Sequence, residues 1–227
     1  MLDNPIICAL DTANIDNAIQ LAKLIKGKVS MIKLGLEFFT AHGISGVKVM
    51  SQLDIPIFLD LKLHDIPNTV ARAISIIKDL NIKMMTIHIS GGKEMILRAM
   101  DVLLDSTILL VGVTVLTSID NNDLRDVGIY QDTSVYVDSL VKLAVNSGLK
   151  GIVCSAYEVK EIRNKYCDLK LIVPGIRIMY NDSDQKRISD PKTVILDGAN
   201  YLVIGRPITQ SHDPICTIEN ILSNIYS

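Results

Sequence analysis

The stretch from Asp60 to Thr69 holds the residues whose types and spacing are best suited to chemistry. It reads DLKLHDIPNT and directly follows the apolar run that starts at Ile57. Side chains two positions apart on a strand point to the same face, so Asp60 and Lys62 are expected side by side. Asp65 follows three residues later, in the loop after the strand. The pattern predicts a carboxylate–ammonium pair with a second carboxylate near it.

Two earlier apolar runs also finish on charged residues. Asp11 ends the first run and Lys33 lies near the end of the second, which gives five charges of alternating sign at successive strand ends. Ordinary salt bridges are the structural alternative. Because exposed ion pairs contribute little to stability, five such charges favour a ligand site.

A lysine flanked by two carboxylates remains protonated, since nearby negative charge favours the cation. Such a lysine serves as a cation and a general acid, whereas a Schiff-base lysine must lose its proton first. The chemistry predicted for Lys62 is therefore stabilisation of developing negative charge, followed by proton delivery.

The elements that position these charges are short β-branched runs that alternate with segments of helical spacing. Runs that are apolar on both faces are typical of parallel strands covered by helices. The predicted strands are Ile6–Leu10, Met31–Leu36, Ile57–Lys62, Met84–Ile89, Ile108–Val115, Gly151–Ser155, Lys170–Val173 and Tyr201–Gly205.

Eight strands alternating with helices are compatible with a closed (β/α)8 TIM barrel or an open doubly wound sheet. The strand count, and the lack of a GxGxxG motif after the first strand, favour an α/β barrel formed by one domain over residues 1–227. Two connections after strands are long, Thr117–Thr133 and Ile176–Pro191. They lie on the face where barrels place active sites, so we expect them to be binding loops.

The composition limits which partners the protein can bind and indicates its cellular compartment. The net charge is −2, which gives no basic field for nucleic acid or an anionic membrane. The longest apolar run is too short to span a bilayer. The four cysteines show no CxxC spacing, so no metal site is indicated, and unpaired thiols fit a reducing cytoplasm.

Taken together, the motifs resemble the orotidine 5′-phosphate decarboxylase family. The run DLKLHDIPNT matches the DxKxxDIxxT signature of that family, and further matches are spread over nearly the whole chain. They are Ala9–Asp11, Lys33–Gly35, His88–Gly92, Val113–Ser118, Val173–Arg177, Asp184–Arg187 and Val203–Thr209.

The resemblance implies a homodimeric barrel that converts orotidine 5′-monophosphate to UMP and carbon dioxide without a cofactor. By matching motif, Lys62 protonates C6 of the pyrimidine and Asp60 lies beside the substrate carboxylate. Asp65 comes from the partner subunit and completes an array with Lys33. The substrate-binding residues implied are Asp11, Lys33, Thr69 (from the partner), Thr117, Ser118, Pro174, Arg177, Gln185, Gly205 and Arg206.

Two positions depart from the family pattern. Val173 stands where threonine is usual, and Ile178 replaces a common proline, which affects the phosphate loop rather than the reaction. One alternative is the related 3-keto-L-gulonate 6-phosphate decarboxylase group, which uses magnesium and generally has an acidic residue where this chain has Lys33. A non-catalytic nucleotide-binding barrel is the other.

Overall fold

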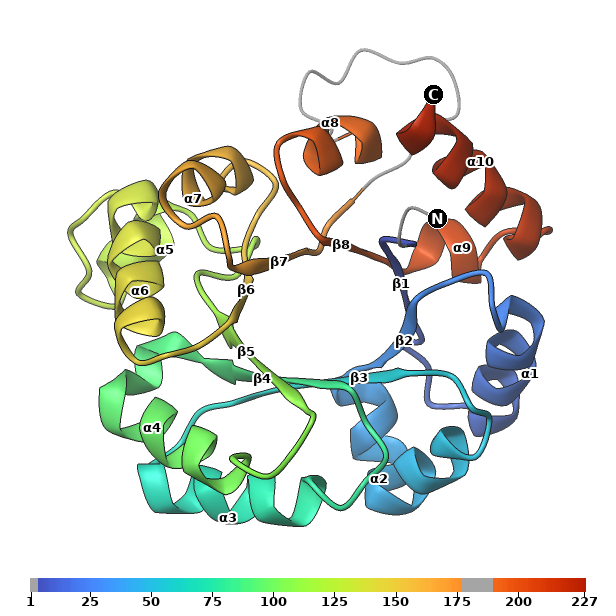
Figure 1. Ribbon diagram of the computed structural model, residues 1–227, viewed down its shortest axis with the longest axis horizontal. Helices are drawn as coiled ribbons and strands as arrows, with labels where there is room; N and C mark the ends of the chain where they lie inside the picture. Colours follow the sequence, from blue (N-terminus) through green and yellow to red (C-terminus); the bar gives the residue numbers. More distant parts are fainter. Residues whose placement is uncertain (1–3, 177–189) are drawn as a thin grey trace.

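Eight parallel strands close into a barrel in the computed structural model, which describes residues 4–176 and 190–227. The strands pair in sequence order, and β8 closes the ring by pairing with β1, with Cys8 opposite Ile204 (Figure 1). The predicted (β/α)8 barrel is confirmed. The strands are β1 Ile6–Ala9, β2 Met31–Leu34, β3 Ile57–Leu63, β4 Met84–His88, β5 Leu109–Val113, β6 Gly151–Val153, β7 Lys170–Val173 and β8 Tyr201–Ile204.

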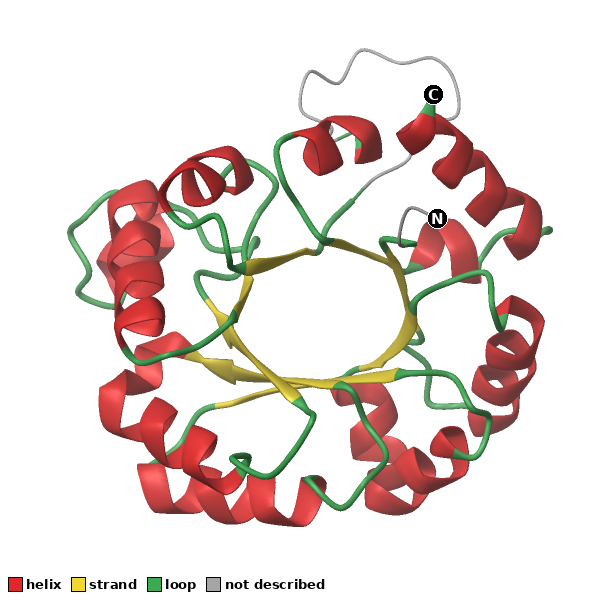
Figure 2. Cartoon of the chain, in the orientation of Figure 1, coloured by secondary structure: helices red, strands yellow, loops and turns green. Residues whose placement is uncertain are grey.

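Helices surround this ring of strands on the outside (Figure 2). They are α1 Ile15–Ile25, α2 Leu36–Ser51, α3 Pro67–Ile77, α4 Gly92–Val102, α5 Asn121–Asp126, α6 Thr133–Asn146, α7 Val159–Lys165, α8 Pro191–Leu196, α9 Arg206–Thr209 and α10 Pro214–Tyr226, with a 3-10 turn at Ile89–Gly91. The helix α2 is kinked at Gly43, whose φ of 56° is left-handed. Within the described ranges, no helix is long and apolar enough to cross a membrane.

The strands have two apolar faces because they are covered on both sides. Ile7 and Ala9 of β1 belong to a cluster in the barrel interior, whereas Ile6 and Cys8 pack in the layer between strands and helices. This two-residue alternation explains why the strand sequences are continuously apolar.

The inward-facing rows become polar toward the carboxyl ends of the first four strands. In β2 the row runs from buried Met31 to Lys33, and in β3 it runs from buried Phe58 to Asp60. In β4 it runs from Met84 to Thr86. Because parallel strands place their carboxyl ends at one face, these polar groups converge at one mouth of the barrel.

The long connection after β5 contains a helix that the sequence analysis missed. Helix α5 begins after Asp120, whose side chain accepts hydrogen bonds from the backbone N–H groups of Asn122 and Asp123. The Asp123 carboxylate in turn accepts from the N–H of Asp120. This reciprocal capping box stabilises the first turn of a helix too short for its periodicity to be recognised.

Candidate active site

Four of the five predicted charges form one continuous array at this mouth. The Nζ of Lys33 lies 3.0 Å from Oδ1 of Asp11 and 3.5 Å from Oδ2 of Asp60. The Nζ of Lys62 is 2.8 Å from each carboxylate oxygen of Asp60. The order Asp11–Lys33–Asp60–Lys62 therefore alternates in sign across β1, β2 and β3.

The centre of the array is buried. Lys33 is only 8% exposed and Asp60 only 7%, whereas the Asp11 side chain is 53% exposed. Burial of a charge is costly unless it is paired, and here each buried charge has a partner of opposite sign. Both buried charges of the array are thus ion-paired.

The pKa of Asp60 is set by burial on one side and by ion pairing and hydrogen bonding on the other. Burial acts to raise the pKa, but the charges of Lys33 and Lys62, together with hydrogen bonds from Lys62 and Thr86, outweigh it. The pKa of Asp60 consequently lies below its usual value of 3.8. Asp60 is a carboxylate at neutral pH and fixes the two ammonium groups beside it.

The regular strand predicted through Lys62 is interrupted at that residue. Lys62 has a φ of 49°, in the left-handed region, and the pairing of β3 with β4 shifts register between Leu59 and Leu63. Asp60 and Lys62 still meet, but through a bulge rather than through regular alternation. Bulges commonly redirect a side chain next to a site.

Gly35 provides the space that the array needs. A Cβ at this position would lie 2.9 Å from Oδ1 of Asp11 and 3.0 Å from Nζ of Lys33. These atoms are the ends of flexible side chains, so a methyl group would displace the ion pair rather than the backbone. The sequence motif included Gly35, but its role is visible only in the structure.

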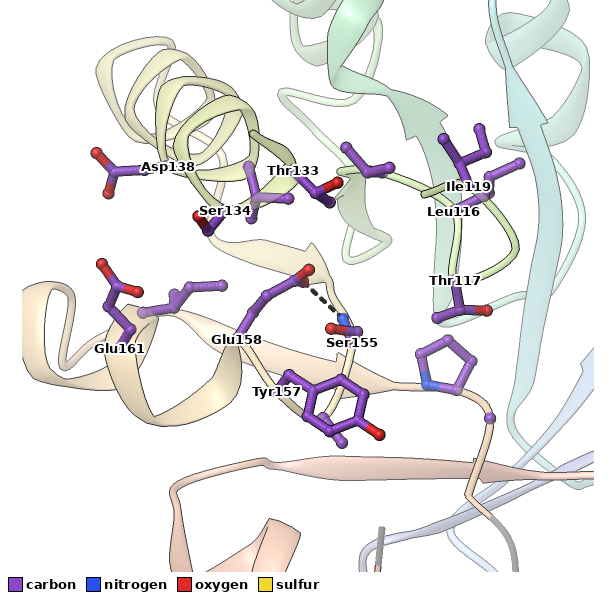
Figure 3. A pocket seen from close by; sticks show the side chains of 16 residues that line it. Leu116, Thr117, Ile119, Thr133, Ser134, Asp138, Ser155, Tyr157, Glu158 and Glu161 are labelled. Atoms are coloured by element: carbon purple, nitrogen blue, oxygen red, sulfur yellow. Dashed lines mark hydrogen bonds between the residues drawn. The ribbon is translucent and has the colours of Figure 1, made fainter. Parts of the chain in front are cut away.

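The other half of the mouth carries a cavity of about 590 Å³, whose lining includes the carboxylates of Asp138, Glu158 and Glu161. Thr117, after β5, and Pro174, after β7, which are two of the predicted substrate-binding residues, line this cavity. Figure 3 shows the carboxylate of Glu158 reaching the backbone N–H of Ser155, a bond of 2.8 Å. Burial raises the pKa of Glu158, although the bonds from Ser155 act against it.

The remaining predicted residues that the structure describes form no ion pair with the array. Gly205 and Arg206 follow β8, and Arg206, which is exposed, begins α9. Thr69 and Ser118 are exposed. Asp65 is exposed and accepts a hydrogen bond from the N–H of Ile66 at 2.7 Å; none of the ion pairs within residues 4–176 and 190–227 includes it. Arg177 and Gln185 lie outside the described residues.

A model of the "Orotidine 5′-phosphate decarboxylase / HUMPS family" matches residues 4–221 of the chain. The chain belongs to this family.

Relatives and solved structures agree with the family over the whole chain. A protein from Ehrlichia canis (strain Jake), named orotidine 5′-phosphate decarboxylase, is 62% identical over 98% of this chain and 98% of its own length. One of the same name from Wolbachia pipientis subsp. Culex pipiens is 51% identical over 98% and 99%. The crystal structure of orotidine 5′-phosphate decarboxylase from Lactobacillus acidophilus covers 99% of this chain and 100% of its own, with 35% identity and a TM-score of 0.87.

One residue in contact with the charged array was not among the residues predicted from the sequence. Thr86 is fully buried in β4, accepts a hydrogen bond from the backbone N–H of Lys62 at 2.8 Å, and donates one to Oδ1 of Asp60 at 3.0 Å. The available signal was a threonine in the apolar run of β4, on the same face as Met84 and His88.

Replacing Asp60 by Asn tests the electrostatic balance of the array. The Asp60→Asn change leaves Lys62 without its carboxylate and Lys33 with only Asp11, so we expect the free energy of unfolding at pH 7 to fall by about 3 kcal/mol. Because the folded-state pKa of Asp60 lies below the unfolded one, its stabilising contribution is present above about pH 4 and is lost as the pH falls through the folded pKa. Urea titrations should therefore show the gap between parent and variant narrowing below about pH 4.

The matched control is Asp54→Asn. The Asp54 side chain is 86% exposed and 3.7 Å from Lys26, and asparagine tolerates its left-handed φ of 53°. We expect this control to change stability by less than about 0.5 kcal/mol at each pH. If the difference in unfolding free energy between the parent and Asp60→Asn stays constant from neutral to acid pH, the lowered pKa assigned to Asp60 is wrong.

Proposed function

We propose that this chain decarboxylates orotidine 5′-monophosphate to UMP and carbon dioxide without a metal or an organic cofactor. The observation that carries the proposal is the ammonium group of Lys62, 2.8 Å from both oxygens of buried Asp60, in a chain of the decarboxylase family. The family places the reaction in pyrimidine nucleotide biosynthesis.

In the proposed step the bond between C6 and the substrate carboxylate breaks, and carbon dioxide leaves. The electron pair of that bond remains on C6, and a proton from Nζ of Lys62 forms the new C6–H bond. Lys62 then recovers a proton from solvent. A preorganised cation aimed at developing negative charge lowers the barrier, because the site need not reorganise during the reaction.

Asp60 and Lys33 position this cation. Asp60 holds Nζ of Lys62 through both oxygens, and Lys33 balances the second charge of the cluster at 3.5 Å from Asp60. We place the substrate carboxylate beside Asp60, and the ribose hydroxyls beside Asp11 and Lys33. The proposal does not depend on repulsion between the two carboxylates.

The 5′-phosphate is assigned to the loops after β7 and β8. Gly205 and Arg206 follow β8, and Arg177 and Gln185 lie in the sequence between β7 and α8. Arginine suits a phosphate because its fork donates two parallel hydrogen bonds. Binding energy from this remote group can hold the pyrimidine against the array. Thr117, Ser118 and Pro174 are assigned to the ribose and pyrimidine.

The proposed active form is a homodimer with shared sites. Asp65 is exposed on the connection from β3 to α3, Thr69 is exposed in the first turn of α3, and Ile66 between them is 68% exposed. The resemblance to the decarboxylase family supports placing this exposed segment against a second copy of the chain. We assign Asp65 and Thr69 to the site of the neighbouring subunit.

We also place the enzyme in the cytoplasm, where four unpaired cysteines are compatible with the redox state.

The metal-dependent 3-keto-L-gulonate 6-phosphate decarboxylase type of reaction is the second candidate. What argues against it is the ammonium group of Lys33, which lies between Asp11 and Asp60 at 3.0 and 3.5 Å. A cation already fixed between these carboxylates repels a divalent metal from the same place.

The direct test is the absorbance change on adding orotidine 5′-monophosphate to enzyme treated with EDTA. We expect full turnover without metal in the parent, and a fall in kcat of about 10³-fold or more for Lys62→Ala, because the proton donor and the cation are both lost. The control Lys28→Ala removes an exposed lysine, 2.7 Å from Glu219, and should leave turnover unchanged. Near-normal turnover in Lys62→Ala removes Lys62 from the mechanism, and metal-dependent turnover favours the second candidate.

A methyl group at Gly35 tests whether the geometry of the array matters. Gly35→Ala should displace the Asp11–Lys33 pair and lower kcat/KM by about tenfold or more, with a melting temperature close to that of the parent. Gly46→Ala is the control for a loss of packing away from the array, because its Cβ would clash with Cβ of His42 in the same helix. That variant should lose stability yet keep its activity per folded molecule. Unchanged kcat/KM in Gly35→Ala contradicts the role of the pair.

Mixing two inactive variants tests the shared sites. A dimer of one Lys62→Ala subunit and one Asp65→Ala subunit has one site with both residues intact and one with neither. Random exchange should therefore restore activity at about one site in four. Absence of recovery, with subunit exchange proven by mass spectrometry, argues against an Asp65 supplied by the partner.

A further inference from the structure

The bulge in β3 has a single residue of the next strand opposite it. Leu59 pairs with Met85 and Leu63 pairs with Ile87, so residues 60–62 of β3 lie opposite Thr86 alone. Three residues facing one cannot all make regular ladder hydrogen bonds. The hydroxyl of Thr86 fills this irregular place, accepting from the Lys62 N–H at 2.8 Å.

We propose that Thr86 is a positioning residue for the reaction, which sets the backbone of Lys62 and the carboxylate of Asp60 through one hydroxyl group. This inference rests on the proposed function, because it concerns the lysine assigned as proton donor. Thr86 touches no reacting atom and acts through the two residues that do.

The backbone of Lys62 requires such a contact. Its φ of 49° is in a region that residues with a Cβ rarely adopt, so the surroundings must hold it there. The Thr86 side chain is fully buried. Without the hydroxyl, the Lys62 N–H would lose its partner opposite the bulge, which a partly buried amide does not tolerate well.

The hydrogen bonds at Thr86 have a fixed direction. The Lys62 N–H donates to Oγ1, and an ionised Asp60 can only accept, so the single hydroxyl hydrogen points at Oδ1 of Asp60, 3.0 Å away. The same Oδ1 accepts from Nζ of Lys62 at 2.8 Å. The contacts form a closed loop from the backbone of Lys62 through Thr86 and Asp60 to its own ammonium group.

This loop couples the direction of the lysine side chain to the position of its counter-ion. Lys33 from β2 and Lys62 from β3 face Asp60. His88 lies two residues beyond Thr86 on β4, and its pKa is lowered by burial and by the charges of His64 and Lys62, against the smaller opposing effect of Asp60. Among these groups Thr86 is the uncharged one that contacts both Asp60 and Lys62. Removal of its hydroxyl should therefore change the geometry of the reacting cation more than the affinity for a nucleotide.

The experiment compares Thr86→Val, Thr86→Ser and Thr217→Val. Valine keeps the shape of threonine and removes the hydroxyl, whereas serine keeps the hydroxyl. Thr217 in α10 is the matched control, a threonine 7% exposed whose hydroxyl donates to the carbonyl of Asp213 at 3.0 Å and contacts Ser211. For each of the three variants, the turnover of orotidine 5′-monophosphate is measured and a crystal structure is determined.

For Thr86→Val we expect kcat to fall about tenfold to a hundredfold while KM changes less than about threefold, because a hydrogen bond to a charged group is lost away from the substrate. Thr86→Ser should recover kcat to within about threefold of the parent, and Thr217→Val should match the parent. Parental kcat in Thr86→Val, or an equal loss in Thr86→Ser, overturns the proposal.

The crystal structures separate this proposal from the proposed reaction. In Thr86→Val, Lys62 should leave the left-handed region or move its Nζ away from Asp60, whatever the enzyme turns over. An unchanged Lys62 backbone and ion pair in that structure overturns the positioning role. A parent enzyme with no decarboxylase activity, but with a displaced Lys62 in the Thr86→Val structure, contradicts only the proposed reaction.

Discussion

The carboxylate of Asp60, buried inside the barrel between two lysine ammonium groups, is the constraint on which the mouth of the barrel depends. A lone charge at 7% exposure would destabilise the fold, so Lys33 and Lys62 must both be close to it. The same need for compensation explains the bulge at Lys62 and the hydroxyl of Thr86. The groups that make this burial tolerable are those that the proposed chemistry requires.

Charged and polar residues are distributed unevenly around the mouth of the barrel. The inward rows of β1 to β4 carry Asp11, Lys33, Asp60 and Thr86 near their carboxyl ends, whereas Gly205 and Pro174 follow β8 and β7. The ion-paired array lies on one side of the mouth, and the cavity lined by Thr117 and Pro174 lies on the other. This asymmetry suits a ligand whose reacting carbon and whose phosphate are far apart, because each end needs a different surrounding.

Local sequence was sufficient for the barrel and for most of the array. Runs such as Ile6–Ala9 and Tyr201–Ile204 predict strands because both of their faces are apolar, and strand ends predict where Asp11, Lys33 and Asp60 converge. The left-handed Lys62 was not predictable, since it arises from the pairing of β3 with β4, which no local pattern records. Thr86 was missed for the same reason. The assignments of Asp65 and Thr69 concern a second copy of the chain, and one sequence does not define that contact.

In the proposed mechanism the array holds the ammonium group of Lys62 where negative charge develops on C6. This placement is tested by the distance between Nζ of Lys62 and C6 of the pyrimidine in a crystal structure of the protein with bound UMP. We expect a distance within about 3.5 Å, with Nζ still bound to Asp60, since proton transfer needs near contact. A separation beyond about 5 Å, or another cation in that place, would contradict it.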